Sequence, residues 1–269
     1  MKQRADRLLV DQGIVSDRKE AEALILAGKV FVAGKQVPIK PGTQLDIDTK
    51  FHLKESEKSK FASFGGDKLA DSLDHFQLSV AGKIALDIGA STGGFTDCLL
   101  RRGALRVYAV DVGYGLIDWK LRQDERVVLL ERENIRYIDK KKIPELIEVT
   151  TVDVSFISVK KVVPVLQHHL LEGAILLILI KPEFEVTADE VPSGGIIRDK
   201  RKQASVLCDV GAFLEKSGFA VLGFHKTPKK RKSKNDEFFC HAVYSRPEVS
   251  KKLEEMVENA IRTAFPENN

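Results

Sequence analysis

The chain has 269 residues, of which 43% are hydrophobic and 30% are charged, and its formal net charge is +4 at pH 7. This composition is typical of a globular protein with a sizeable core, and the modest charge permits nucleic-acid binding without indicating it. The three cysteines (Cys98, Cys208 and Cys240) are far apart, without a Cys-x-x-Cys pair, which argues against a disulfide framework or a zinc site. No signal-peptide core opens the chain, and no apolar run reaches the roughly 20 residues of a spanning helix. We therefore expect a soluble, cytoplasmic protein without a membrane partner.

The first 54 residues predict a small α+β module. In chain order the pattern predicts a helix from Arg4 that stops at Gly13, a second helix capped by Ser16 or Asp17 and ending at Gly28, a strand at Val30–Val32, a turn at Ala33–Lys35, a return strand at Gln36–Ile39 and a strand at Leu45–Ile47. The polar stretch Lys54–Lys60 has no apolar periodicity. We therefore predict a domain over 1–54, a linker over 55–63 and a second domain over 64–269.

The first module is basic, with ten basic and seven acidic residues in positions 1–54. The candidate RNA contacts are Arg4, Arg7, Arg18, Lys19, Lys29 and Lys35. Charge alone would favour a solvated helix surface. The order Arg4-x-Asp-x-x-Leu, then Arg18-x-x-Ala-x-x-Leu-Ile-x-x-Gly-x-Val-x-Val-x-Gly, resembles the RNA-binding domain named after ribosomal protein S-four, with Asp17 where that family usually has Ser. The resemblance implies that this module binds RNA.

From Phe64 onward, apolar runs of strand length alternate with helix-length segments. The predicted buried strands are Ile84–Ile88, Val107–Val110, Val127–Leu130, Val149–Val154 and Ile175–Ile180, with helices such as Phe95–Leu100 and Val162–Leu171 between them. This alternation predicts an α/β fold with a parallel sheet covered on both faces. The strands Phe219–Phe224 and Phe238–Tyr244 are too close for a crossover helix, so we expect them to pair antiparallel. A helix over Glu248–Phe265 follows.

A glycine-rich turn, Asp87-Ile-Gly-Ala-Ser-Thr-Gly-Gly-Phe95, joins the first of these strands to a helix. Glycines let a ligand approach the backbone closely at such a turn. A dinucleotide fingerprint would need glycine at Ser91, which argues against an NAD-dependent oxidoreductase. An acidic residue before the glycines suits the cationic aminoacyl end of S-adenosylmethionine, and Asp111, which ends the next strand, could bind ribose hydroxyls. Both aspartates could instead cap their turns, but two acid-ended strands beside one glycine turn favour a cofactor site.

Asn134, after the third strand, could flank the adenine of this cofactor. The candidate cofactor residues are Asp87, Gly89, Ser91, Thr92, Gly93, Gly94, Phe95, Asp111, Asn134 and Asp153.

Four charged residues form a candidate catalytic group. Asp153 and Lys181 end two predicted strands, Glu237 opens another, and Lys68 leads into the second domain. Because the carboxyl ends of strands form the site in open α/β sheets, we expect Asp153 and Lys181 to be adjacent. Each residue alone would be interpreted as a cap or a solvated strand end.

Together these residues resemble the Lys-Asp-Lys-Glu tetrad of the FtsJ-like ribose 2′-O-methyltransferases. The segments Asp-Val-Ser-Phe-Ile-Ser and Gly-Tyr-Gly…Trp-Lys-Leu-Arg are similar to the TlyA family, over essentially the whole chain. The resemblance implies a Rossmann-like methyltransferase fold, a mixed sheet with an antiparallel last strand, that uses S-adenosyl-L-methionine to methylate the ribose 2′-hydroxyl of cytidine in ribosomal RNA or ribosomal subunits. The chain departs from the family at Phe64, Glu183 and Lys234, where Arg, Gln and Gly are usual, but it keeps the tetrad.

In this scheme Lys181 acts as the base, if its surroundings favour the neutral amine, or else steers the hydroxyl and stabilises the developing alkoxide. Asp153 and Glu237 would orient the two lysines. The basic run at Lys229, Lys230, Arg231 and Lys232 precedes Glu237 and would steer phosphates rather than serve as solvated surface.

Two other functions stay open. A membrane-active hemolysin is suggested by the label that TlyA-family members often carry, although no strongly amphipathic helix is evident. A non-catalytic RNA-binding or ribosome-assembly factor would not need the intact tetrad.

Overall fold

The computed structural model describes residues 2–15, 17–18, 21–22, 25, 30–32, 40–53, 59–228, 235–245 and 253–263. Contacts divide the chain into two compact units, residues 1–59 and residues 60–269. Each unit has its own hydrophobic core.

The N-terminal unit is a small α+β assembly. Its described elements are β1 (Lys2–Arg4), α1 (Ala5–Asp11), β2 (Val30–Val32), β3 (Gln44–Asp46) and β4 (Phe51–Leu53). β1 pairs with β3 and β2 with β4, both antiparallel. The first helix ends just before Gly13, which has a left-handed backbone (φ +67°), as predicted. The predicted turn 33–35 and return strand 36–39, with Ser16 and Gly28, lie outside the described residues, and β4 was not predicted.

Seven strands form one sheet in the C-terminal unit. They are β5 (Ile84–Ile88), β6 (Arg106–Asp111), β7 (Val127–Glu131), β8 (Ile147–Val152), β9 (Leu170–Ile180), β10 (Phe219–Lys226) and β11 (Phe238–Tyr244), in the spatial order β10-β11-β9-β8-β5-β6-β7. Neighbours from β9 to β7 are parallel, whereas β11 is antiparallel to both β9 and β10. The predicted mixed sheet with an antiparallel last strand is confirmed.

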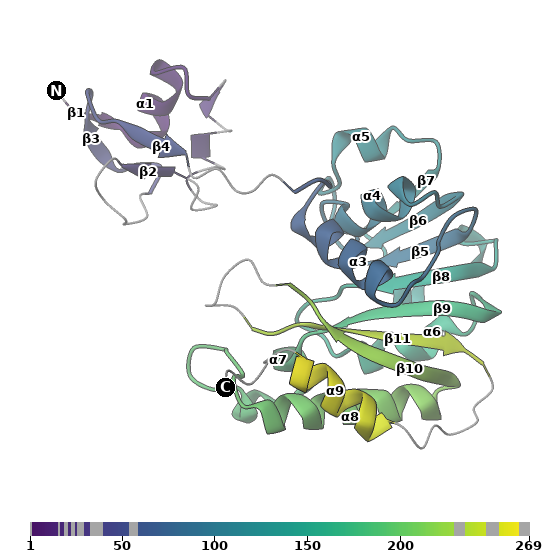
Figure 1. Cartoon of the computed structure of the whole chain (residues 1–269). Helices are drawn as coiled ribbons and strands as arrows, with labels where there is room; N and C mark the ends of the chain where they lie inside the picture. Colours follow the sequence, from purple (N-terminus) through teal and green to yellow (C-terminus); the bar gives the residue numbers. More distant parts are fainter. Residues whose placement is uncertain are drawn as a thin grey trace. The chain divides into compact units, whose positions relative to one another are not determined.

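Helices cover both faces of this sheet (Figure 1). They are α3 (Phe64–His75), α4 (Gly94–Arg101), α5 (Trp119–Arg122), α6 (Val163–Leu166), α7 (Pro182–Glu185), α8 (Lys200–Lys216) and α9 (Leu253–Thr263), with short 3-10 turns at Ile135–Tyr137, Lys140–Lys142, Val159–Lys161 and Ala188–Glu190. Side chains of α3 and α4 pack into the core on one face, and those of α6, α8 and α9 into the core on the other.

Two helix predictions need correction. The predicted helix over Val162–Leu171 is wrong beyond α6, because Leu170 pairs with Ile147 and already belongs to β9. The longest described helix, α8, was not predicted at all. Cys98 and Cys240 are buried, as expected of small apolar side chains. Within the described ranges, no helix has both the length and the hydropathy that crossing a bilayer requires.

Candidate active site

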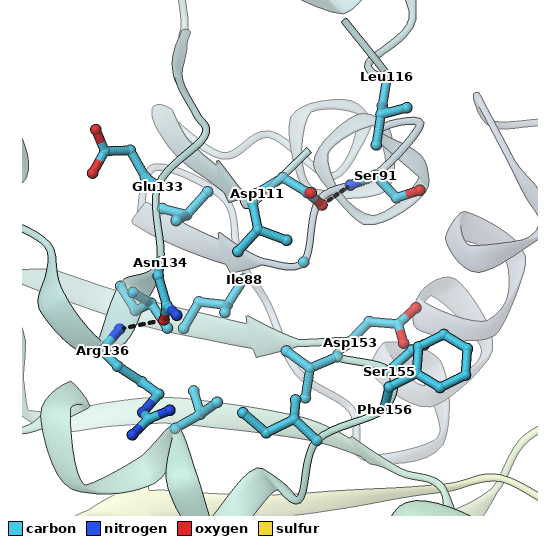
Figure 2. A pocket seen from close by; sticks show the side chains of 17 residues that line it. Ile88, Ser91, Asp111, Leu116, Glu133, Asn134, Arg136, Asp153, Ser155 and Phe156 are labelled. Atoms are coloured by element: carbon cyan, nitrogen blue, oxygen red, sulfur yellow. Dashed lines mark hydrogen bonds between the residues drawn. The ribbon is translucent and has the colours of Figure 1, made fainter. Parts of the chain in front are cut away.

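A pocket of about 450 Å³ lies at the carboxyl edge of β5, β6 and β8. Its walls come from the ends of these strands and from the segments that follow β7 and β8 (Figure 2). The lining includes Gly89, Ser91, Asp111, Asn134, Asp153 and Ser155, and most of the other lining residues are apolar. A concave, mainly apolar site with a few polar groups is typical of small-ligand binding.

Gly89 makes the close approach of two strands possible. Its backbone is left-handed (φ +82°), and a Cβ atom there would lie 2.2 Å from the carbonyl oxygen of Asp153. The Asp153 amide in turn donates to the carbonyl of Ile88 at 2.9 Å. Glycine at this position therefore lets the turn after β5 lie directly against the end of β8, which forms the floor of the pocket.

Asp111 is the carboxylate at the end of β6. Its Oδ2 accepts from the Ser91 amide at 2.7 Å (Figure 2). Its Oδ1 accepts from the Gly113 amide, also at 2.7 Å. Each carboxylate oxygen has a second lone pair, so Asp111 is fixed in direction and can still accept hydrogen bonds from a ligand. A ribose diol is the partner that this arrangement fits.

Asn134 borders the pocket opposite the glycine turn. Its Oδ1 accepts from the Arg136 amide at 3.1 Å and so caps the 3-10 turn that follows. That bond leaves the two side-chain N–H groups as donors at the pocket wall, where they suit a ring nitrogen such as those of adenine.

The structure changes the predicted role of Asp87. Its side chain has no exposed surface and does not line the pocket. Oδ2 accepts from the Thr96 hydroxyl at 2.7 Å and Oδ1 from the Thr151 hydroxyl at 2.9 Å. Burial raises the pKa of this carboxyl to about 7, against the lowering effect of the two threonines. Asp87 therefore ties the end of β5 to α4 and β8, and the expectation that it touches the ligand is not supported.

Three more of the candidate cofactor residues pack inside the protein. Phe95 is buried with its ring centroid 5.6 Å from that of Phe239. A Cβ on Gly93 would lie 2.3 Å from Leu121, and one on Gly94 would lie 2.2 Å from the Ser63 hydroxyl. These glycines bring α4 close to α3 and α5 rather than admitting a ligand.

Thr92 is exposed but does not line the pocket, and its carbonyl accepts from the Asp118 amide at 3.1 Å.

The four tetrad residues form two ion pairs. Lys181 Nζ lies 2.6 Å from Asp153 Oδ1, and it also donates to Ser155 Oγ at 2.9 Å and to the carbonyl of Val154 at 3.2 Å. The second pair joins Lys68 to Glu237. The expected adjacency of Asp153 and Lys181 is therefore found, and each lysine has a carboxylate partner.

Sheet topology explains why these residues meet. β8 and β9 are parallel neighbours, so Asp153 and Lys181 follow them at the same edge. The antiparallel register pairs Phe238 with Ile180, which places Glu237 beside Lys181. Helix α3 then presents Lys68 to Glu237.

Glu183, one of the departures from the family pattern, lies close to this group. Burial raises the pKa of Glu183; Glu237 raises it further and Lys181 lowers it. The chain therefore carries a further carboxyl within electrostatic reach of Lys181.

Phe156 is a site residue that the sequence analysis missed. Its side chain is 91% exposed, its backbone is left-handed (φ +63°), and it borders the pocket (Figure 2). Its ring centroid lies 5.1 Å from that of Phe184, and Glu185 holds the same loop by accepting from Ser158 Oγ at 2.6 Å. The signal in the sequence was an aromatic residue three positions after a strand-ending aspartate.

The candidate RNA contacts of the N-terminal unit are only partly described. Asp6, which is fully buried, accepts from Arg4 at 2.7 Å and from Arg18 at 3.1 Å. The hydrogen bond from Arg4, followed by that from Arg18, lowers the pKa of Asp6 to about 2 against the effect of burial. Arg7 is exposed. Positions outside the described residues are Lys19, Lys29, Lys35, Lys229, Lys230, Arg231 and Lys232.

Residues 61–244 match the family of FtsJ-like methyltransferases. Over 260 residues the chain is 37% identical to the 16S/23S rRNA (cytidine-2′-O)-methyltransferase TlyA of Mycobacterium tuberculosis, covering 96% of this chain and 97% of that protein. It is also 39% identical over 241 residues to Hemolysin A of Brachyspira hyodysenteriae, covering 89% and 99%. A solved structure from Streptococcus thermophilus, named as a hemolysin, is similar with a TM-score of 0.72, 38% identity, and coverage of 96% and 95%. The likeness extends over both units of the chain.

Proposed function

Because the chain belongs to the FtsJ-like methyltransferase family, with TlyA among its relatives, we propose that it transfers a methyl group from S-adenosyl-L-methionine to the ribose 2′-hydroxyl of a cytidine in ribosomal RNA. The observation that carries the proposal is the pairing of Lys181 with Asp153 at the mouth of the pocket.

The residues of the pocket fit S-adenosyl-L-methionine. Asp111 offers oriented acceptor oxygens for the ribose, and Asn134 with the neighbouring apolar side chains suits the adenine. A Cβ at Gly89 would clash with the carbonyl of Asp153 and disturb the floor of the pocket. When bound, this cofactor supplies a methyl group that its sulfonium has already activated.

Lys181 is the residue that meets the substrate hydroxyl. A ribose hydroxyl is a weak nucleophile, so the protein must hold its oxygen in line and assist the loss of its proton. Lys181 Nζ already donates to one hydroxyl, Ser155 Oγ, at 2.9 Å, so a ribose hydroxyl that replaces Ser155 would meet the same ammonium group. Lys181 thus orients the ribose oxygen and stabilises negative charge that develops on it.

The two carboxylates position the two lysines. Asp153 holds Lys181 from the end of β8, and Glu237 holds Lys68 from the start of β11. A lysine has many rotamers, and ion pairs of this kind restrict them before the substrate arrives. Lys68 then adds positive charge at the same edge of the sheet.

We propose ribosomal RNA as the partner of both units. We propose the cytoplasm, where ribosomal RNA is assembled into subunits, as the location of the protein. Arg4, Arg7 and Arg18 in the N-terminal unit and the basic run 229–232 would contact phosphates. The relative from Mycobacterium tuberculosis is named for methylation of both 16S and 23S RNA, so both subunits are the substrates to test.

The test is to treat unmodified small and large ribosomal subunits with the protein and the cofactor, digest the RNA and identify the nucleosides by mass spectrometry. We expect 2′-O-methylcytidine. A base-methylated nucleoside would contradict the assigned reaction, and leakage of dye from liposomes without any methylation would favour the hemolysin alternative.

A further inference from the structure

The segment 132–142, which follows β7, is basic and aromatic but belongs to none of the sites above apart from its first residues. It holds five basic and two acidic residues. The segment begins at the cofactor pocket and leads from β7, the last strand at its end of the sheet, to β8 on the far side of β5 and β6. Figure 2 shows Glu133, Asn134 and Arg136 at that pocket.

Apolar side chains fix the inner side of this segment. Ile135 and Ile143 are buried and Ile138 packs partly against the same core. Asn134 and Asp139 cap the two 3-10 turns between them, by accepting from the amides two residues later. The basic and aromatic residues therefore project from a backbone that is already ordered, which lowers the entropy that a ligand would otherwise have to overcome.

Two arginines of the segment stack on exposed tyrosines. The guanidinium carbon of Arg132 lies 4.2 Å from the ring centroid of Tyr114, and that of Arg136 lies 5.1 Å from the ring centroid of Tyr137. The rings are 64% and 75% exposed. One exposed cation–π contact stabilises a fold only weakly, so folding alone does not explain two large rings left open to solvent.

The backbone of Arg132 is strained. It is left-handed (φ +56°), a conformation that costs energy in a residue with a β-carbon. Its amide donates to the carbonyl of Gly113 at 2.9 Å, and the next amide donates to the carbonyl of Asp111 at 3.0 Å. The strain is therefore held by the same strand end that carries the ribose-binding carboxylate.

The charges of the segment are largely uncompensated. Lys142 pairs with Glu133. Arg132, Arg136, Lys140 and Lys141 make no ion pair with any residue in the part of the chain that the structure describes.

We propose that residues 132–142, together with Tyr114, bind an unpaired stretch of the substrate RNA next to the target nucleotide. This inference rests on the proposed function. Tyr114 and Tyr137 offer flat faces on which bases stack, and an arginine behind each ring keeps its N–H groups for phosphate oxygens. Lys140 and Lys141, further along the segment, supply positive charge for more distant phosphates of the same strand. Stacking on two exposed rings requires splayed bases, so single-stranded RNA is the ligand rather than a duplex.

The test measures binding of the full chain to a fluorescent single-stranded oligoribonucleotide and to the matching duplex, over a range of salt concentrations. Arg132→Ala should weaken binding of the single strand about tenfold. The double variant Lys140→Ala/Lys141→Ala should lower the slope of log affinity against log salt concentration by the amount expected for about two lost phosphate contacts. Arg132→Lys keeps the charge but not the planar stack, so it should keep the salt slope and lose affinity. Lys216→Ala, which removes an exposed lysine in the last turn of α8 and outside the segment, is the matched control and should bind like the wild type.

Cofactor affinity and methyl transfer to ribosomal subunits are measured on the same preparations. We expect unchanged cofactor affinity and a raised KM for subunits in the Arg132 and Lys140/Lys141 variants. Wild-type affinity in these variants, equal binding of the duplex, or parallel loss of cofactor binding would each overturn the proposal. If the wild type transfers no methyl group but the variants still bind single-stranded RNA more weakly, the proposed function is refuted and the RNA-binding role of the segment is supported. If the wild type is active but the variants bind RNA and methylate subunits like the wild type, the proposed function is supported and the role of the segment is refuted.

Discussion

Asp87→Asn is the substitution for which the structure predicts the most specific result. The Asp87 carboxyl is fully buried, and it accepts hydrogen bonds from the hydroxyls of Thr96 and Thr151. Burial raises its pKa from 3.8 to about 7. An asparagine has nearly the same shape but no charge at any pH, and either threonine can accept from its amide.

The sign of the pH effect follows from the raised pKa. Between pH 3.8 and pH 7 the folded protein holds a proton on Asp87 that the unfolded chain has lost, so the free energy of unfolding falls as the pH rises. Each pH unit in this window removes about 1.4 kcal/mol, which sums to about 4 kcal/mol by pH 7. Below pH 4 and above pH 7 the contribution is constant.

Urea unfolding of the wild type and of Asp87→Asn at pH 4 and pH 8 isolates this contribution, because all other titrating groups are shared. The variant should gain stability relative to the wild type by a few kcal/mol between the two pH values, while its cofactor affinity changes little. A difference in unfolding free energy that is the same at both pH values would refute the reasoning. A large loss of cofactor affinity would restore the direct ligand contact that the burial argues against.

Two further substitutions test the pocket and its mouth. Gly89→Ala should abolish cofactor binding by calorimetry, because the new methyl group meets the Asp153 carbonyl; the control Gly82→Ala has a similar left-handed backbone with open space around it and should lose only about 1–2 kcal/mol of stability. Cofactor binding that survives in Gly89→Ala would contradict the close approach. Phe156→Ala should raise the KM for ribosomal subunits while the Tm stays within the small change typical of surface positions, since the ring is 91% exposed; unchanged kinetics would show that the ring does not meet the substrate.

The position of a site residue could be predicted from the sequence where that residue directly follows a strand. Asp153 and Lys181 end neighbouring parallel strands, and such ends share an edge whatever the helices do. Gly89 and Asp111 were predictable for the same reason. The contact of Asp87 with the cofactor stays a prediction, which the burial of its carboxyl disfavours. Side chains alternate along a strand, so Asp87 faces the opposite side from Ile88, which lines the pocket.

Other features depend on tertiary packing, which the hydrophobic pattern of the sequence does not predict. α8 begins with Lys200, Arg201 and Lys202, which oppose the helix dipole, and it contains Gly211 in its interior. Its helical state is decided by the apolar face that it buries against the sheet. The stacking of Arg132 on Tyr114 joins segments 18 residues apart through a strained backbone, and no periodicity signals it.

The central claim is that Lys181 acts on the ribose hydroxyl and not on the cofactor. It is tested most directly by methyl transfer from radiolabelled S-adenosyl-L-methionine to unmodified ribosomal subunits, comparing the wild type, Lys181→Ala and the control Lys216→Ala, with cofactor affinity measured alongside. We predict that label appears on ribose with the wild type and the control, and vanishes in Lys181→Ala while cofactor affinity is nearly unchanged. Transfer that survives in Lys181→Ala, or loss of cofactor binding in that variant, would contradict the account.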